Sequence, residues 1–195
     1  MILYLTIITV CVAIISTVVN FIYEMNFLTV LGYTALAVVV VILVDALVAT
    51  VARLLPKKCA QHDKKAYTVS AKEKKFYEKI KIRKWKDLVP EIGHFTGFRK
   101  NKIVDPKSVE YLERFLLEAC YGEIGHFFCL FFGFAILLLF PLTEIWLAVS
   151  IPVAIVNVFL NIPSIFILRY NSYKLEILRK SNLKKRMREE MSSAA

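Results

Sequence analysis

The sequence has no Lys or Arg over two long stretches, residues 1–52 and 115–168. All 26 of its basic residues lie elsewhere, with 18 between Arg53 and Arg114 and the other 8 between Arg169 and Arg188. A soluble domain has no physical reason to sort its cations in this way, because its water-facing surface accepts them everywhere. Apolar stretches separated by basic blocks are typical of a multi-span membrane protein whose basic blocks face the cytoplasm.

The chain also lacks the short motifs that mark several common classes of protein. Its four cysteines (Cys11, Cys59, Cys120 and Cys129) show neither a C-x-x-C pair nor metal-ligand spacing, so we expect free thiols and no disulfide framework, and we assign no metal ligands. Whether a metal binds near Glu123 and His126 stays open. There is no nucleophile elbow around a serine, no glycine-rich phosphate loop and no His-x4-Asp acyltransferase pattern. No nucleic-acid-binding signature accompanies the net charge of +10, so we assign that charge to membrane headgroups and expect no nucleic-acid partner.

Four apolar segments are long enough to cross a bilayer core, which needs about 20 apolar residues. They lie at 2–23, 27–55, 123–140 and 145–168, and only short turns separate the members of each pair. The first segment has no basic flank before it and no small-x-small cleavage site after it, so we expect a retained span rather than a signal peptide. Because neither outer turn carries a cation, we expect both termini in the cytoplasm and a multi-pass protein of the cell membrane.

The predicted fold is therefore an all-α integral membrane protein with two transmembrane hairpins. The first hairpin covers residues 1–55 and the second covers 123–168. A basic cytoplasmic loop over 56–122 joins them, and a basic tail over 169–195 follows, which we expect to be helical at first and then frayed. The pattern shows no internal repeat and leaves the oligomeric state open.

The cytoplasmic loop contains two segments that we expect to lie at the membrane interface. Residues 76–86 interleave aromatic and aliphatic side chains with cations, which is typical of a helix or strand in the headgroup region. A second, amphipathic helix is predicted to begin at Lys107 or Ser108, since apolar residues recur after it at helical spacing.

A cluster of polar residues lies where this amphipathic helix becomes the third span. Glu123 and His126 are three residues apart, so they share one face of a helix, and Glu118 lies on a nearby stripe. A carboxylate beside an imidazole can orient the ring and raise its basicity, so that the histidine accepts a proton from a hydroxyl nucleophile. The alternative is a Glu–His hydrogen bond that only satisfies polar groups at the interface.

Polar side chains also occur inside the second and fourth spans, where they are costly. Asp45 is either a carboxylate that binds a substrate or partner cation, or an interfacial acid that is hydrated or paired with an arginine. Asn157 and Asn161 share one helix face, and such amides can hydrogen-bond to the third span and hold the bundle together. Arg169 and Tyr170 end the fourth span, where they would be interfacial anchors or would bind an anionic or sugar headgroup.

Three segments of the sequence match three motifs, which follow one another in a fixed order. Residues 83–90 (RKWKDLVP) match a Trp-Lys-Asp-x-x-Pro region, residues 118–126 match Glu-x4-Glu-x2-His, and 161–163 with 169–171 match Asn-x-Pro…Arg-Tyr-Asn. Through them the chain resembles the glycosyl-diaponeurosporenoate acyltransferase family, the membrane enzymes of staphyloxanthin-type carotenoid biosynthesis. The family commonly has Arg, Gln and Arg where this chain has Tyr121, Leu168 and Ser172.

The resemblance implies an integral membrane acyltransferase that acts at the cytoplasmic leaflet. It would move a fatty acyl group from a thioester donor, acyl-CoA or an acyl carrier protein, to a hydroxyl of a glycolipid or glycosylated carotenoid. No cofactor would be bound beyond this co-substrate. His126 would be the general base, oriented by Glu123, with Glu118 as a second carboxylate.

The resemblance also implies a set of substrate-binding residues at the same membrane depth. A cationic, aromatic platform would receive the donor, and polar groups at the end of the fourth span would hold an oxyanion or the headgroup of the acceptor. The platform is Trp85, Lys84 and Lys86, and the polar groups are Asn161, Arg169, Tyr170 and Asn171.

Two other functions compete with the acyltransferase. A non-catalytic scaffold or lipid-binding accessory protein would use the same residues only for packing and headgroup contacts. A small transporter with Asp45 as its ion site is the third, although transporter sites lie near the middle of the membrane and these motifs lie at its cytoplasmic edge.

Overall fold

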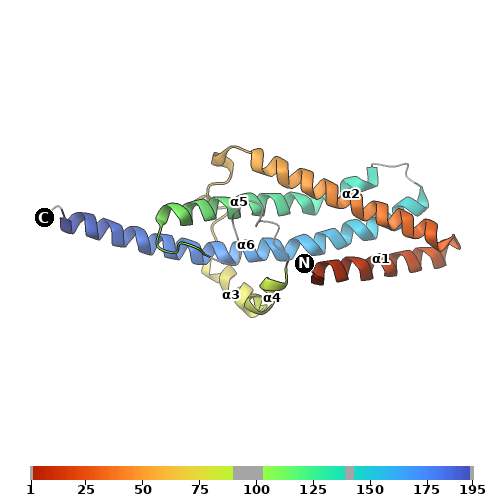
Figure 1. The fold of residues 1–195 in the computed structure, drawn as a ribbon, viewed down its shortest axis with the longest axis horizontal. Helices are drawn as coiled ribbons and strands as arrows, with labels where there is room; N and C mark the ends of the chain where they lie inside the picture. The colour runs from red at the N-terminus through yellow and green to blue at the C-terminus, as the bar shows by residue number, and fades with distance from the viewer. Residues whose placement is uncertain (1, 90–102, 139–142, 194–195) are drawn as a thin grey trace. The chain divides into compact units, whose positions relative to one another are not determined.

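In the computed structural model of the protein, residues 2–89, 103–138 and 143–193 are described. Every regular element among them is a helix, and no strand occurs in these ranges (Figure 1). The four longest helices are α1 (Ile2–Tyr23), α2 (Phe27–Leu54), α5 (Val109–Phe132) and α6 (Glu144–Ser193). The shorter ones are η1 (Lys57–Cys59), α3 (Ala71–Lys79), α4 (Ile82–Trp85), η2 (Lys86–Leu88) and η4 (Gly133–Leu138).

The predicted all-α membrane fold is confirmed. Within the described ranges, four helical segments are long and apolar enough to cross a membrane, namely α1, α2, α5 continued by η4, and α6. The segment after residue 70 is helical rather than extended, since α3 and α4 occupy it. The protein is thus a multi-pass membrane protein built from helices.

α5 begins close to the predicted position, whereas α6 extends further than the sequence pattern predicts. α5 begins at Val109, where Ser108 Oγ accepts a hydrogen bond from the backbone N–H of Tyr111, and it continues without a break into the third span. α6 continues from the fourth span to Ser193, so the tail is helical well past the point where we expected fraying. No glycine or proline follows residue 168 in this helix, and its many Lys, Arg, Glu and Leu residues are strong helix formers.

The chain divides into two compact units. α5 and α6 each contribute residues to both. The unit that we call the membrane unit comprises Met1–Leu54, Leu88–Pro90 and Ile124–Ile165, and the one that we call the basic unit comprises Leu55–Asp87, Glu91–Glu123 and Phe166–Ala195.

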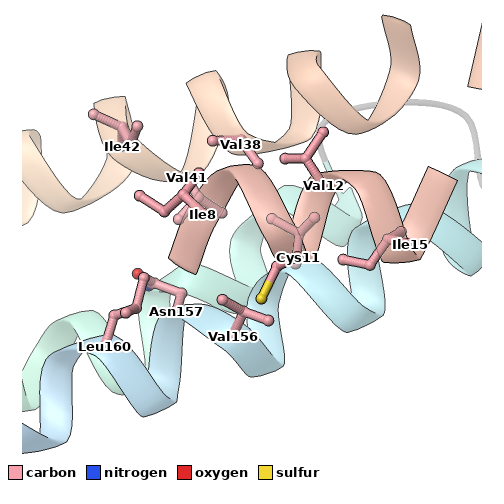
Figure 2. A pocket seen from close by; sticks show the side chains of 11 residues that line it. Ile8, Cys11, Val12, Ile15, Val38, Val41, Ile42, Val156, Asn157 and Leu160 are labelled. Carbon is pink, nitrogen blue, oxygen red and sulfur yellow. The ribbon is translucent and has the colours of Figure 1, made fainter. Parts of the chain in front are cut away.

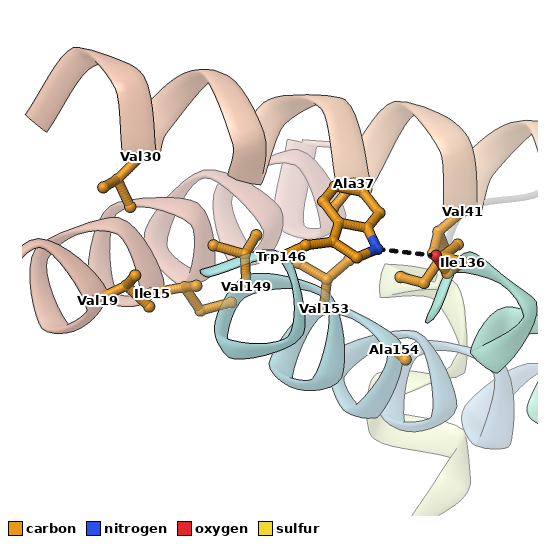
Figure 3. Packing of buried hydrophobic residues seen from close by; sticks show 10 residues of the cluster. All are labelled: Ile15, Val19, Val30, Ala37, Val41, Ile136, Trp146, Val149, Val153 and Ala154. Carbon is orange, nitrogen blue, oxygen red and sulfur yellow. Dashed lines mark hydrogen bonds between the residues drawn. The ribbon is translucent and has the colours of Figure 1, made fainter. Parts of the chain in front are cut away.

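The core of the membrane unit forms around Trp146, which is almost completely buried. Its indole Nε1 donates a hydrogen bond of 3.2 Å to the carbonyl of Ile136, so its one polar atom is satisfied (Figure 3). α1 and α2 pack side by side as a hairpin, and Ser16 of α1 donates to Thr34 of α2 across it at 3.0 Å. The apolar side chains packed in this core are Ile15, Val19, Val30, Ala37, Val41, Ile136, Val149, Val153 and Ala154.

The outward faces of the first two helices stay apolar and exposed. Phe21 and Leu54 are examples, with 84% and 78% of their side chains exposed. A soluble protein would not leave so many large apolar side chains in contact with water, whereas lipid tails accept them at no cost.

The basic unit is held by aromatic and ionic contacts. Tyr77 of α3 packs against Phe166 and Tyr170 of α6, with ring centroids 5.5 and 6.3 Å apart. Arg179 of α6 contacts Glu113 of α5 at 3.2 Å. The apolar cluster between these two helices is Leu112, Phe115, Leu116 and Leu175.

The charge pattern predicts which side of the membrane each polar segment faces. We expect a cysteine introduced at Gln61 to react with a membrane-impermeant maleimide only in inside-out vesicles, and one at Glu24 to react only in intact cells, because cations stay on the cytoplasmic side. The unsubstituted protein gives the background from native thiols. Labelling of Gln61→Cys in intact cells would contradict this topology.

Candidate functional site

The membrane unit contains a hydrogen-bonded network of four polar side chains from three helices. The Asp45 carboxylate of α2 accepts from the amide nitrogens of Asn157 and Asn161 of α6, at 3.2 and 3.0 Å. Asn161 Oδ1 lies 2.8 Å from Nδ1 of His126 on α5. Asn157 and Asn161 are each only 6% exposed, so these groups satisfy one another inside the unit rather than in water.

The Asp45 carboxylate determines which group donates and which accepts in the other hydrogen bonds of this network. The Asn161 amide donates from its nitrogen to Asp45 Oδ2, so its oxygen faces His126. An amide oxygen cannot donate, and therefore His126 Nδ1 must carry a proton. In a neutral imidazole with this tautomer the lone pair lies on Nε2, which is the arrangement that a general base requires.

The same network holds three helices together. Asn157 Nδ2 also lies 3.4 Å from the carbonyl of Cys129 on α5, and Asn161 Nδ2 donates to the carbonyl of Asn157 at 3.1 Å. The prediction that the two amides bond to the third span is confirmed. The sequence reasoning missed that Asp45 is their shared acceptor, although polar groups in different spans generally pair with one another.

A glycine makes room for this arrangement at the start of η4. A Cβ atom added to Gly133 would lie 2.5 Å from Asn157 Nδ2, which is closer than any real contact allows. Any larger residue at this position therefore displaces the amide that bonds to Asp45.

The basic unit contains a second polar cluster, centred on Arg169 of α6. Its guanidinium binds Glu73 of α3 in a two-point fork, with Nε to Oε1 at 2.5 Å and Nη2 to Oε2 at 3.0 Å. Its Nη1 donates to Glu123 Oε1 of α5 at 2.5 Å and to the carbonyl of Ala66 at 2.8 Å. The structure thus gives Arg169 two carboxylate partners of its own chain, where the sequence pattern predicts an anionic substrate.

This cluster shifts the acid–base behaviour of the two α3 residues in it. The hydrogen bond from Arg169 holds the pKa of Glu73 below its ordinary value. Tyr77 donates to Glu73 Oε1 at 2.5 Å, and burial together with this bond raises the pKa of the Tyr77 hydroxyl. Glu73 stays ionised and Tyr77 stays neutral over the physiological range, so the cluster is a fixed structural unit there.

Tyr170 is buried and lies between two cations. Its hydroxyl accepts from Arg83 Nε at 2.6 Å, and the Lys174 ammonium lies 4.4 Å from its ring centroid. Asn171, the next residue of α6, is half-buried. Tyr170 therefore acts as an anchor for basic side chains, which include the residue just before the predicted platform.

The predicted platform itself lies on α4 and η2. Trp85 is half-buried, and its indole donates to the carbonyl of Ile80 at 3.0 Å. Lys84 is exposed, and Lys86 Nζ lies 3.6 Å from Asp87. The residues between this platform and α5 that carry part of the sequence pattern, 90–102, lie outside the described residues. Glu118, the second predicted carboxylate, is half-buried on α5.

Two departures from the family pattern have structural explanations. Tyr121 donates to the carbonyl of Leu55 at 2.8 Å, so its hydroxyl ties α5 to the segment after α2. Leu168 is buried against Gly122, where an added Cβ would lie 3.1 Å from its Cδ1. Tyr121 thus occupies its position by a hydrogen bond to the backbone, and Leu168 occupies its position by packing.

Within the described parts of the chain, no group of three or more His, Cys, Asp or Glu side chains is placed to hold a metal ion. The network around His126 offers one imidazole and one carboxylate, joined by amides.

The fold and these clusters define a four-span membrane protein with a histidine-containing polar network inside its bundle. The chain belongs to the glycosyl-4,4'-diaponeurosporenoate acyltransferase family, whose model matches residues 61–181. It is therefore an acyltransferase, of a family that acts in carotenoid biosynthesis. No curated protein and no solved structure matches the chain significantly. Asp45 lies outside the matched segment, so the family match alone gives no reason to select it.

We expect Gly133→Ala to destabilise the membrane unit, because the added methyl group displaces the Asn157 amide. Loss of a buried hydrogen bond typically costs about 1–3 kcal/mol. Thermal unfolding of the purified protein in detergent measures this. Gly32→Ala is the matched control, since nothing lies within 4 Å of its added Cβ and the change should be neutral or slightly stabilising. Equal effects of the two variants would contradict the packing described.

The depressed pKa of Glu73 predicts that α3 loosens in acid. Such a group contributes stability above its ordinary pKa, and the contribution is lost as pH falls through the folded-state pKa. Hydrogen exchange of the α3 amides, corrected for intrinsic rates, should therefore stay nearly constant from neutral pH down to roughly pH 4 and speed up as the pH falls further. Glu73→Gln should exchange faster at neutral pH and show a weaker pH dependence. An identical pH dependence in this variant would refute the assignment to Glu73.

Proposed function

We propose that the protein transfers a fatty acyl group from a thioester donor to a hydroxyl of a glycolipid or glycosylated carotenoid, at the cytoplasmic leaflet. His126 is the general base. The observation that supports this role most directly is the chain of hydrogen bonds from Asp45 through Asn161 to His126 Nδ1. It links an imidazole to a carboxylate through one amide, and thereby assigns the lone pair to Nε2.

In the proposed reaction an ester bond forms, a thioester bond breaks, and His126 carries one proton from the acceptor hydroxyl to the departing thiolate. His126 Nε2 takes the proton of the acceptor hydroxyl as its oxygen attacks the thioester carbonyl carbon. The tetrahedral intermediate collapses with cleavage of the carbon–sulfur bond. The departing thiolate takes the proton back from the imidazolium, so the products are an ester and a free thiol, and the histidine returns to its starting state.

Asp45 and Asn161 are positioning residues in this proposal. They fix the ring and its tautomer, and the Asp45 charge stabilises the imidazolium that forms during the reaction. Glu123 and Glu118 stay candidate carboxylates on the strength of their sequence spacing from His126. The bond from Arg169 to Glu123 supports a role for that pair in holding the basic unit together.

The cations of the basic unit support a thioester donor with a negatively charged carrier. The exposed side chains of Lys81, Arg83 and Lys84 lie on or beside α4, next to the half-buried Trp85. Such a patch suits the phosphates of coenzyme A or the acidic surface of an acyl carrier protein. The half-buried Asn171 is a proposed contact for the acceptor headgroup, and the buried Tyr170 next to it is proposed to hold Arg83 in place.

We expect His126→Ala to lower turnover about 100- to 10,000-fold, the usual contribution of a general base. Lipid mass spectrometry of a host strain that lacks the gene and expresses each variant at matched levels measures this. His62→Ala is the matched control, because that ring contacts Glu176 at 3.5 Å in the basic unit and has no proposed role. Full activity of His126→Ala would overturn the role of His126 as the general base.

The Asp45→Asn variant tests whether Asp45 positions the His126 ring for catalysis or only stabilises the fold. In the wild type, nitrogen NMR of histidine-labelled protein should show His126 with its proton on Nδ1, identified by the signal that disappears in His126→Ala. Without the carboxylate the Asn161 amide is free to turn over, so both tautomers should appear and turnover should fall. A wild-type signal with the proton on Nε2 would contradict the network.

A further inference from the structure

The membrane unit contains an apolar pocket between α1, α2 and α6 (Figure 2). Eleven side chains line it, and apart from Cys11 and Asn157 all of them are valine, isoleucine or leucine. An apolar cavity of this kind stays dry, because water inside it would find too few polar partners. Its natural occupant is therefore hydrocarbon.

One residue belongs both to the pocket and to the polar network. Asn157 lines the pocket, and its amide nitrogen donates to Asp45, which also accepts from Asn161, the partner of His126. A molecule that fills the pocket thus has its apolar part among aliphatic side chains and one end beside the network. This is the arrangement that an enzyme needs when it acts on the head of a hydrocarbon chain.

The pocket is narrow. Its volume is about 50 Å³. Along α6 its lining extends from Val153 to Leu160, which at 1.5 Å per residue corresponds to about 10 Å. A stretch of a single acyl chain suits a pocket of this size, whereas a sugar ring or a two-chain lipid is too bulky for it.

We infer that this pocket binds the acyl chain of the thioester donor, with the carbonyl end beside Asn157. The inference rests on the function proposed above and adds the source of its chain-length selectivity. Ile15 and Val153 are buried in the pocket wall, and Val153 lies one helical turn before Asn157, so these side chains limit how far a chain can extend. The enzyme is therefore selective for acyl length through residues that take no part in the chemistry.

Adjacent valines of α2 provide a matched test. Val38 lines the pocket, whereas Val39 is 53% exposed on the outer face of the same helix. The protein in lipid nanodiscs is given a mixture of saturated acyl thioesters of increasing length and one acceptor, and the products are weighed by mass spectrometry. We expect Val38→Phe to lower the ratio of long to short acyl products about tenfold or more, with Val39→Phe like the wild type.

A second variant keeps the test valid if Val38→Phe misfolds. Ile15→Ala enlarges the pocket and should shift the products toward longer chains. An unchanged length profile in both Val38→Phe and Ile15→Ala would overturn the inference. A parallel assay uses one donor and a mixture of acceptors with different tails. A change in the preference among these acceptors, with the donor profile constant, would also overturn the inference, since the pocket would then hold the tail of the acceptor.

A measurement without turnover separates this inference from the proposed function. A non-transferable thioether analogue of the donor should protect Cys11 from a small apolar maleimide in the wild type and in Val39→Phe, and less so in Val38→Phe, as peptide mass mapping would show. Protection without transfer from any donor would support the pocket and refute the proposed reaction. Transfer without protection of Cys11 would refute the pocket alone.

Discussion

A polar group left without a partner inside an apolar bundle costs several kcal/mol, and this constraint governs the membrane unit. Asp45, Asn157, Asn161 and His126 each lie in the apolar, membrane-spanning part of a helix, and each is satisfied by another member of the set. Because every bond in the chain needs a donor facing an acceptor, the one group that can only accept, the Asp45 carboxylate, fixes the direction of all the others. The position of α2, α5 and α6 within this unit and the tautomer of a histidine thus follow from the same requirement.

The same requirement operates separately in the basic unit. Arg169 gathers Glu73, Glu123 and the carbonyl of Ala66, and this joins α3, α5, α6 and the loop before α3 around one guanidinium. A residue that the sequence pattern assigns to a substrate headgroup is thereby a structural centre of its unit. Its fork geometry explains why an arginine suits this place better than a lysine, which is a point charge without two parallel donors.

The family gives the chemistry, and the hydrogen bonds suggest how this chain performs it. Membership in the glycosyl-4,4'-diaponeurosporenoate acyltransferase family rests on residues 61–181, which contain His126 and Asn161. Asp45 and most of the apolar pocket belong to the α1–α2 hairpin, outside that segment. In the proposed mechanism, this hairpin takes part in catalysis as well as anchoring the enzyme in the membrane. It carries Asp45, which positions the general base through Asn161, and most of the walls of the pocket for the acyl chain.

The sequence by itself determined the class of protein, the four spans and the polar residues of interest, because charge sorting, helix length and the cost of polar groups in lipid act locally along the chain. It also determined that Asn157 and Asn161 share a face, since that follows from helical spacing alone. Only the tertiary structure decided that Asp45 is their acceptor, that Arg169 binds Glu73 and Glu123, and that α6 continues to Ser193. These contacts join residues about 46 to 116 positions apart, and helical periodicity says which face a residue occupies but not which helix it meets.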